Sequence, residues 1–156
     1  MTVETNINKS QVRKHFSVHA AEYDRYAIVQ QVVARRLISI LQGHPCSWKR
    51  GLEVGCGTGM LSRQLLPLQP NQSLVLSDLA HGMCQCAQHK YHEAEVCGAD
   101  AAALPFGNDC FDLFVSSSVY QWLNDLPNAF AEISRVLRPG GVVALALFGE
   151  NTLYEL

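Results

Sequence analysis

Three glycines stand at alternate positions in the stretch LEVGCGTGM, as Gly55, Gly57 and Gly59. Glycine has no Cβ atom, so a turn of this composition lets a ligand come close to the backbone and tolerates positive φ angles. An apolar run precedes the turn and a helical pattern follows it. In α/β proteins such turns lie at the carboxyl ends of strands, where nucleotides bind. We therefore predict a site for a nucleoside-containing ligand at this turn.

The glycine spacing also limits which ligand it is. A dinucleotide-binding loop has the pattern G-x-G-x-x-G, but here Met60 stands where the third small residue is needed, which disfavours NAD. S-adenosylmethionine (SAM) has no phosphates and joins a nucleoside to an amino acid through a cationic sulfur. It needs an anion near its ammonium group, which Glu53 can supply directly or through water. The alternative for Glu53 is a solvated carboxylate at a strand end.

Two further carboxylates follow the next predicted strands. Asp78 comes 23 positions after the first glycine of the turn, close to the spacing at which an acid reaches ribose hydroxyls. Asp100 can accept a hydrogen bond from an adenine amino group while Ala101 offers its backbone N–H. Leu79 and Met83 can pack on the adenosine. Taken singly, each Asp could be a turn or helix cap, and the two apolar residues could be core.

The elements that must position these residues alternate between strand and helix, which is typical of βαβ units with a parallel sheet. Five strands are predicted at Gly51 to Val54, Ser73 to Ser77, Ala94 to Cys97, Phe111 to Ser116 and Val142 to Phe148. Helices are predicted from Thr58 to about Leu66, from about Gly82 to Lys90, and after Pro127. The expected fold is α/β and doubly wound, with a Rossmann-like sheet.

The first part of the chain has a helical pattern. Apolar residues recur every four positions from Val29 to Leu41, and Gly43 and Pro45 end the amphipathic helix. A separate short helix is expected from about Ser10 to Ala21. We predict that residues 1–49 form a helical cap and that residues 50–156 form the ligand-binding core, in one domain together.

Composition excludes several classes of partner. The chain has 12 Lys and Arg against 14 Asp and Glu, a net charge of −2, so nothing draws it to nucleic acid or to anionic membranes. No stretch approaches the roughly 18 apolar residues that span a bilayer, and the six cysteines lack disulfide or zinc spacing. We predict a cytoplasmic protein with free thiols and no metal. The oligomeric state stays open.

The end of the chain is unusual for a doubly wound sheet. The fifth predicted strand is followed by only eight residues, which would leave it as an unpaired apolar edge. We expect either a truncated fragment or a partner that completes the sheet.

Five motifs in order resemble those of class I SAM-dependent methyltransferases: LEVGCGTG, SDLAHGM, GADAAALPF, FDLFVSS and EISRVLRPGG. The resemblance implies that SAM is the cofactor and S-adenosylhomocysteine its product. It also implies a C-terminal hairpin, which we expect to be absent from this sequence. The cofactor contacts that it implies are Gly55, Gly57, Gly59, Asp78, Asp100 and Ala101. We add Cys56, inside the glycine turn, and Ser116, at the end of the fourth predicted strand.

A narrower resemblance is to the malonyl-acyl carrier protein O-methyltransferases of biotin synthesis. It is carried by FSVHAAEYDRYAIVQQVVA, SSSVYQWLNDLPNAFAEISRVLRPGG and ALFGENTLYEL. It suggests that Tyr23, Tyr26, Gln121 and Trp122 lie on the side of the methyl acceptor. The alternative is that the tyrosines belong to the surface or core and that Trp122 serves helix packing.

These resemblances imply methyl transfer to the free carboxylate of a malonyl thioester on acyl carrier protein. A carboxylate is ionised at neutral pH and needs no general base. Two alternatives remain open. One is methylation of another small molecule, such as a quinone ring carbon, which would need a base. The other is a SAM-binding module without activity, since the usual helical insertion that covers the acceptor is missing.

Overall fold

The computed structural model describes residues 6–44, 47–68 and 72–149. These ranges contain one parallel sheet with the strand order β3-β2-β1-β4-β5. The strands are β1 (Arg50–Val54), β2 (Ser73–Asp78), β3 (Glu95–Gly98), β4 (Phe111–Ser117) and β5 (Leu137–Ala146). The order runs outward from β1 in one direction and from β4 in the other. The predicted doubly wound α/β fold is therefore confirmed, with its topological switch point between β1 and β4.

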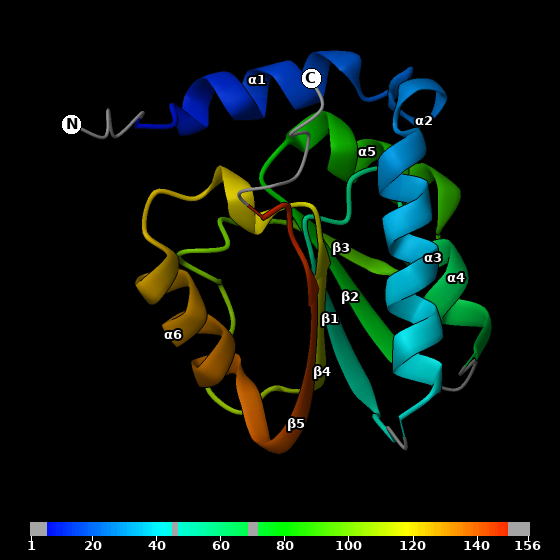
Figure 1. Cartoon of the computed structure of the whole chain (residues 1–156), viewed down its shortest axis with the longest axis vertical. Helices are drawn as coiled ribbons and strands as arrows, with labels where there is room; N and C mark the ends of the chain where they lie inside the picture. Colours follow the sequence, from blue (N-terminus) through cyan, green and yellow to red (C-terminus); the bar gives the residue numbers. More distant parts are fainter. Residues whose placement is uncertain (1–5, 45–46, 69–71, 150–156) are drawn as a thin grey trace.

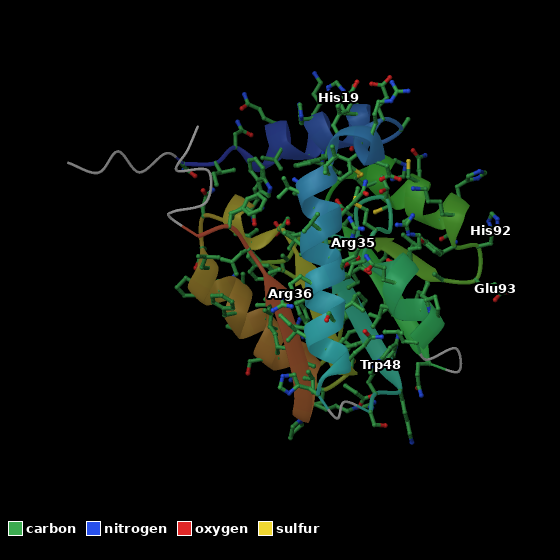
Figure 2. All side chains as sticks on the ribbon, turned by 45° about the vertical axis from the view of Figure 1, so that its right-hand side comes forward. His19, Arg35, Arg36, Trp48, His92 and Glu93 are labelled. Atoms are coloured by element: carbon green, nitrogen blue, oxygen red, sulfur yellow. The ribbon has the colours of Figure 1, made fainter. Side chains whose placement is uncertain are left out.

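Helices cover both faces of this sheet (Figure 1). On one face, α3 (Ile28–Gln42), α4 (Ser62–Leu65) and α5 (His81–Lys90) share a buried apolar cluster with the strands. On the other face, α6 (Leu126–Val136) packs into a second cluster that contains Phe111 and Phe114. Trp48 is 2% exposed and packs in the first cluster, at the end of the molecule opposite His19 (Figure 2). The two clusters fix the positions of the strands, and the strands in turn position the residues of the site.

The first two helices lie across the edge of the sheet where the strands end (Figure 1). They are α1 (Lys9–His19), which Asn8 caps by accepting hydrogen bonds from two backbone N–H groups, and α2 (Tyr23–Tyr26). At Gly82 in α5, an added Cβ would lie 2.3 Å from the carbonyl oxygen of Ser17. The missing side chain at Gly82 is thus what lets α1 settle on α5.

Most predicted element boundaries lie within about two residues of the observed ones, but two starting points differ by more. The helix expected from Thr58 begins only at Ser62, because the φ of +86° at Gly59 is incompatible with a right-handed helix. A short 3₁₀ turn, η1 (Leu66–Leu68), follows it. The last strand begins at Leu137 rather than Val142. Leu137 pairs with Phe111 and Val142 pairs with Leu113, so the residues between them form a bulge.

Strand β5 is an edge of the sheet in the described part of the chain, where it pairs with β4. Val143 in β5 and Leu147 just after it are 45% and 47% exposed. Whether this edge is covered in the whole protein stays a prediction. Residues 150–156, Pro45 and Cys46, which the sequence analysis also used, lie outside the described residues.

Candidate functional site

A cavity open to solvent lies at the carboxyl ends of the strands, and its empty space is about 770 Å³ when the solvent at its mouth is included. The segments that follow β1, β2, β3 and β4 form its floor and sides, and one face of α1 covers it. A second cavity of about 370 Å³ adjoins it and shares Tyr23, Gly55, Gly57 and Ser117 as lining residues.

All three glycines of the turn have positive φ angles, but they differ in what an added side chain would meet. At Gly55 (φ +72°) a Cβ would lie 2.0 Å from Val119, and at Gly59 (φ +86°) it would lie 2.3 Å from Tyr91. At Gly57 (φ +55°) it would meet nothing within 4 Å, and Gly57 lines both cavities. Protein packing thus requires two of the glycines, and the third leaves open space for a ligand.

Asp78 connects the glycine turn to the end of β2. Its Oδ2 accepts a hydrogen bond from the Gly57 N–H and its Oδ1 accepts one from the Ala80 N–H, both at 2.8 Å. Burial raises the pKa of Asp78, while these backbone N–H groups act in the opposite direction. A carboxylate held in this way has a fixed orientation and keeps lone pairs for the hydroxyls of a ribose.

Glu53 lies in the smaller cavity and is almost completely buried, with 2% exposure. Its Oε2 accepts a hydrogen bond from the Ser62 hydroxyl at 2.6 Å. Burial raises the pKa of Glu53 to about 8, with Asp78 adding to the effect and the Ser62 bond opposing it. The alternative of a solvated strand-end carboxylate is therefore wrong. A cation beside Glu53 would oppose this rise in its pKa.

Asp100 follows β3 and faces α1. Its Oδ2 accepts a hydrogen bond from the Lys9 ammonium at 2.7 Å, and its Oδ1 accepts one from the Ala102 N–H. Burial opposes ionisation, but the contacts with Lys9 and Ala102 lower the pKa of Asp100. Asp100 and Ala101 both line the larger cavity. They can therefore reach the outer end of a nucleoside bound there.

Asp24 in α2 links the N-terminal helices to the glycine turn. Its carboxylate accepts hydrogen bonds from the Thr58 hydroxyl and from the Lys90 ammonium, the latter at 2.7 Å. Next to it, the rings of Phe16 and Tyr23 meet edge to face at 5.9 Å. Phe16 also meets Trp122 in this way, and all three rings line the larger cavity.

Most of the predicted site residues come together at these cavities. Gly55, Gly57, Asp78, Leu79, Met83, Asp100, Ala101, Tyr23 and Trp122 line the larger one, and Glu53 and Cys56 line the smaller one. The others do not. Ser116 points into the sheet, where its hydroxyl donates to the Val54 carbonyl oxygen at 2.7 Å. Tyr26 is 70% exposed, Gly59 packs on Tyr91, and Gln121 lines neither cavity.

Several residues of the cavity wall were missed by the sequence analysis. From α1 these are Lys9, Arg13 and Phe16, and from the loop after β4 they are Ser118 and Val119. No local pattern marks the residues of α1, because their place at the cavity depends on contacts with α5, Asp100 and Trp122, which are distant in the sequence. Ser118 has one unusual property, a φ of +61°, which becomes visible only in the structure.

Other ionisable side chains lie away from both cavities. Figure 2 shows His92 and Glu93 at the outer side of the molecule, far from α1. Within the described ranges, no three His, Cys, Asp or Glu side chains gather as metal ligands would. None of the helices in those ranges has the length and apolar composition to cross a membrane.

Residues 52–145 match the protein family described as "Methyltransferase domain". A malonyl-acyl carrier protein O-methyltransferase of Geobacter sulfurreducens is 43% identical over 96% of this chain and 57% of its own length. A bifunctional biotin biosynthesis protein of Saccharophagus degradans is 37% identical over 99% of this chain and 27% of its own length. The chain spans about half the length of the curated methyltransferases that it matches.

Solved structures share the fold at lower identity. A SAM-dependent methyltransferase from Thermotoga maritima superposes with a TM-score of 0.66, at 22% identity over 83% of this chain and 58% of its own. The (4+2)-cyclase SpnF superposes with a TM-score of 0.73, at 19% identity over 89% of this chain and 60% of its own. Because a methyltransferase and a cyclase share this fold, function has to be argued from the site.

Proposed function

The chain belongs to the methyltransferase domain family, and from this premise we propose that it transfers the methyl group of SAM to the free carboxylate of a malonyl group on acyl carrier protein. The single observation that carries the cofactor part is the glycine turn with Asp78. Gly57 leaves open space in the cavity floor, and Asp78 is held at its edge by the Gly57 N–H. The acceptor part rests on the relatives that carry this name at 33–43% identity.

We propose that SAM lies across the strand ends from β3 to β1. Asp100 and Ala101 would hold the adenine, and Asp78 would accept from the ribose hydroxyls, with Leu79 and Met83 against the adenosine. The methionine part would pass over Gly57 into the smaller cavity, where Glu53 lies. An ammonium group beside Glu53 would favour its carboxylate form, so binding is expected to release a proton.

The reaction that this arrangement supports is an in-line displacement. A lone pair on the acceptor carboxylate oxygen forms the new O–CH₃ bond, and the C–S bond breaks with its electrons going to sulfur. A cationic sulfonium and an anionic carboxylate become a neutral thioether and a neutral ester, so no proton moves. The protein has to hold the two reactants in contact and exclude water.

We further propose that the segment of residues 1–49 acts as a cap on the cofactor. Support comes from α1, which covers the larger cavity, and from the fastening of Asp24 to Thr58 and Lys90. Tyr23 and Trp122, which line the cavity beside Phe16, would close the acceptor side. A cytoplasmic location fits the five described cysteines, which are free thiols.

The cofactor proposal is tested by calorimetric titration with S-adenosylhomocysteine. We expect binding to the unmodified protein, and a loss of at least about tenfold in Asp78→Asn, since a ribose hydroxyl would lose a charged acceptor. Glu93→Gln, which changes an exposed carboxylate far from the cavity, serves as the matched control. Equal affinity of the Asp78→Asn variant would contradict the assignment of Asp78.

The acceptor proposal is tested with methyl-labelled SAM and two loaded carrier proteins. Malonyl-acyl carrier protein should acquire a label that mild base releases, as expected for a methyl ester. Acetyl-acyl carrier protein, which has the same thioester but no free carboxylate, should stay unlabelled. Transfer to both carriers, or to neither, would show that the malonyl carboxylate is not the acceptor.

A further inference from the structure

The loop after β4 differs from the rest of the described chain in its buried polar atoms. Among the described residues, three buried side-chain polar atoms lack a hydrogen-bond partner: the hydroxyls of Ser118 and Tyr120 and the Oε1 of Gln121. All three fall within four consecutive residues. Buried polar groups are nearly always satisfied in folded proteins, so such a cluster indicates that a partner is absent.

Of these three residues, Ser118 lines the larger cavity. The Tyr120 ring is stacked on Phe130 at 5.7 Å, under α6, and its hydroxyl lies within that core. Gln121 lines neither of the two cavities. Ser118 is therefore the one of the three residues that borders the larger cavity, with its hydroxyl buried beneath the cavity wall.

Ser118 also holds a costly backbone conformation. Its φ of +61° is in the left-handed region, which glycine adopts freely and serine does not. The backbone is fixed there because the Ser118 N–H donates to the Ala146 carbonyl oxygen at 2.7 Å, at the end of β5. Strained residues of this kind gather at functional sites, where the surrounding structure enforces them.

The position of Ser118 indicates which ligand it serves. In the proposed arrangement the cofactor occupies the ends of β3, β2 and β1, and its methionine part enters the smaller cavity. Ser118 follows β4, the next strand in the sheet, and does not line the smaller cavity. Near it lie Trp122 and Phe16, which close this side of the larger cavity. This is the place left for the methyl acceptor.

We propose that Ser118 orients the acceptor carboxylate by donating its hydroxyl hydrogen bond to the carboxylate oxygen that is not methylated. This inference rests on the proposed function. A hydroxyl is the right donor for a carboxylate, and hydrogen bonds to a charged group are the strong ones. Holding one oxygen leaves the other free to face the methyl group, and the strained backbone fixes the direction of the bond.

The test compares Ser118→Ala with Tyr120→Phe, since each removes one buried hydroxyl without a partner. Initial rates are measured against malonyl-acyl carrier protein at saturating SAM, and the affinity for S-adenosylhomocysteine is measured in parallel. For Ser118→Ala we expect kcat/KM to fall by about 10- to 100-fold, as for a lost hydrogen bond to a charged group, with the affinity within about twofold. Tyr120→Phe should leave both quantities within about twofold.

Ser118→Gly is a second variant that removes the hydroxyl and relieves the strain, and it should lose activity to a similar degree. It keeps the test decisive if the alanine variant folds poorly. An active protein whose Ser118→Ala and Ser118→Gly variants keep their kcat/KM would overturn the role of Ser118 alone. So would an affinity for S-adenosylhomocysteine that falls as much as kcat/KM does. An unmodified protein that makes no methyl ester would overturn the proposed function and this role with it.

Discussion

The turn after β1 and the loop after β4 line the same cavity, but they are built differently. In the first, the Asp78 carboxylate and the Gly57 N–H satisfy each other, and Glu53 accepts from Ser62. In the second, Ser118 is strained and three buried polar atoms have no partner among the described residues. The β1 side is complete before any ligand arrives, whereas the β4 side is not. This difference is expected if the β1 side is preorganised for the cofactor and the β4 side is completed only when the methyl acceptor binds.

The largest expected effect comes from substitutions at Gly55 and Gly57. An added Cβ would collide with Val119 at Gly55 but would enter open space at Gly57. In Gly55→Ala the new Cβ would lie 2.0 Å from Val119 at a positive φ, and we expect a loss of about 3 kcal/mol or more in the free energy of unfolding. In Gly57→Ala the backbone strain alone should cost about 1–2 kcal/mol. That variant should fold but bind S-adenosylhomocysteine at least about tenfold more weakly, because the methyl group occupies ligand space. Urea denaturation and calorimetry measure the two quantities, and equal stability losses in both variants would contradict this distinction.

A second test uses the pH dependence of stability on the complete side of the cavity. The pKa of Glu53 is about 8 in the folded protein, against 4.5 for an ordinary glutamate. Between these values the folded state holds a proton that the unfolded state has released, so the stability contributed by this group falls as pH rises. The slope approaches about 1.4 kcal/mol per pH unit, or a few kcal/mol in all.

The Glu53→Gln variant cannot ionise and can still accept from Ser62, so it should lack this decline. Its free energy of unfolding, measured by urea denaturation from pH 5 to pH 8, should exceed that of the unmodified protein most at pH 8. Glu93→Gln, at an exposed position, is the control and should follow the unmodified profile. Parallel profiles for all three proteins would show that Glu53 is ionised in the fold.

The sequence predicted the β1 side of the cavity better than the β4 side. The order of strands and helices, the glycine turn and Asp78 follow from local patterns, because turn chemistry and alternating elements leave a signal within a few residues. The burial of Glu53 does not, since it depends on Ser62 and on α3 above the sheet. The contributions of Lys9 and Phe16 depend on how α1 packs, and the strain at Ser118 is imposed by β5. Such features arise from tertiary contacts that no short stretch encodes.

A third prediction concerns α1, which covers the larger cavity over both its β1 side and its β4 side. In Gly82→Ala the added Cβ would lie 2.3 Å from the Ser17 carbonyl oxygen, so α1 must move away from α5. We expect a loss of about 1–3 kcal/mol in stability, as for an overpacked contact, and weaker cofactor binding because α1 covers the cavity. In Gly98→Ala the nearest such atom is 4.0 Å away, so this control should change cofactor binding little. Calorimetric titration of both variants decides the matter, and unchanged affinity in Gly82→Ala would mean that α1 does not help to hold the cofactor.

The smallest expected effect concerns backbone strain at two residues. It tests whether the strain at Ser118 is linked to ligand binding, whereas the strain at Asp109 belongs to a turn. Ser118 and Asp109 are the two described non-glycine residues with positive φ, at +61° and +53°. Replacing either with glycine removes the strain, so each should gain up to about 1 kcal/mol in the free energy of unfolding, with the smaller gain at Asp109 because aspartate tolerates this conformation better. The consequences for methyl transfer should differ. Asp109 is exposed and away from the cavity, so Asp109→Gly should keep its activity, whereas Ser118→Gly should be more stable and less active. A stability gain at Ser118 without a loss of activity would mean that the strain there serves the turn alone, as it does at Asp109, and the two sides of the cavity would then differ in packing rather than in function.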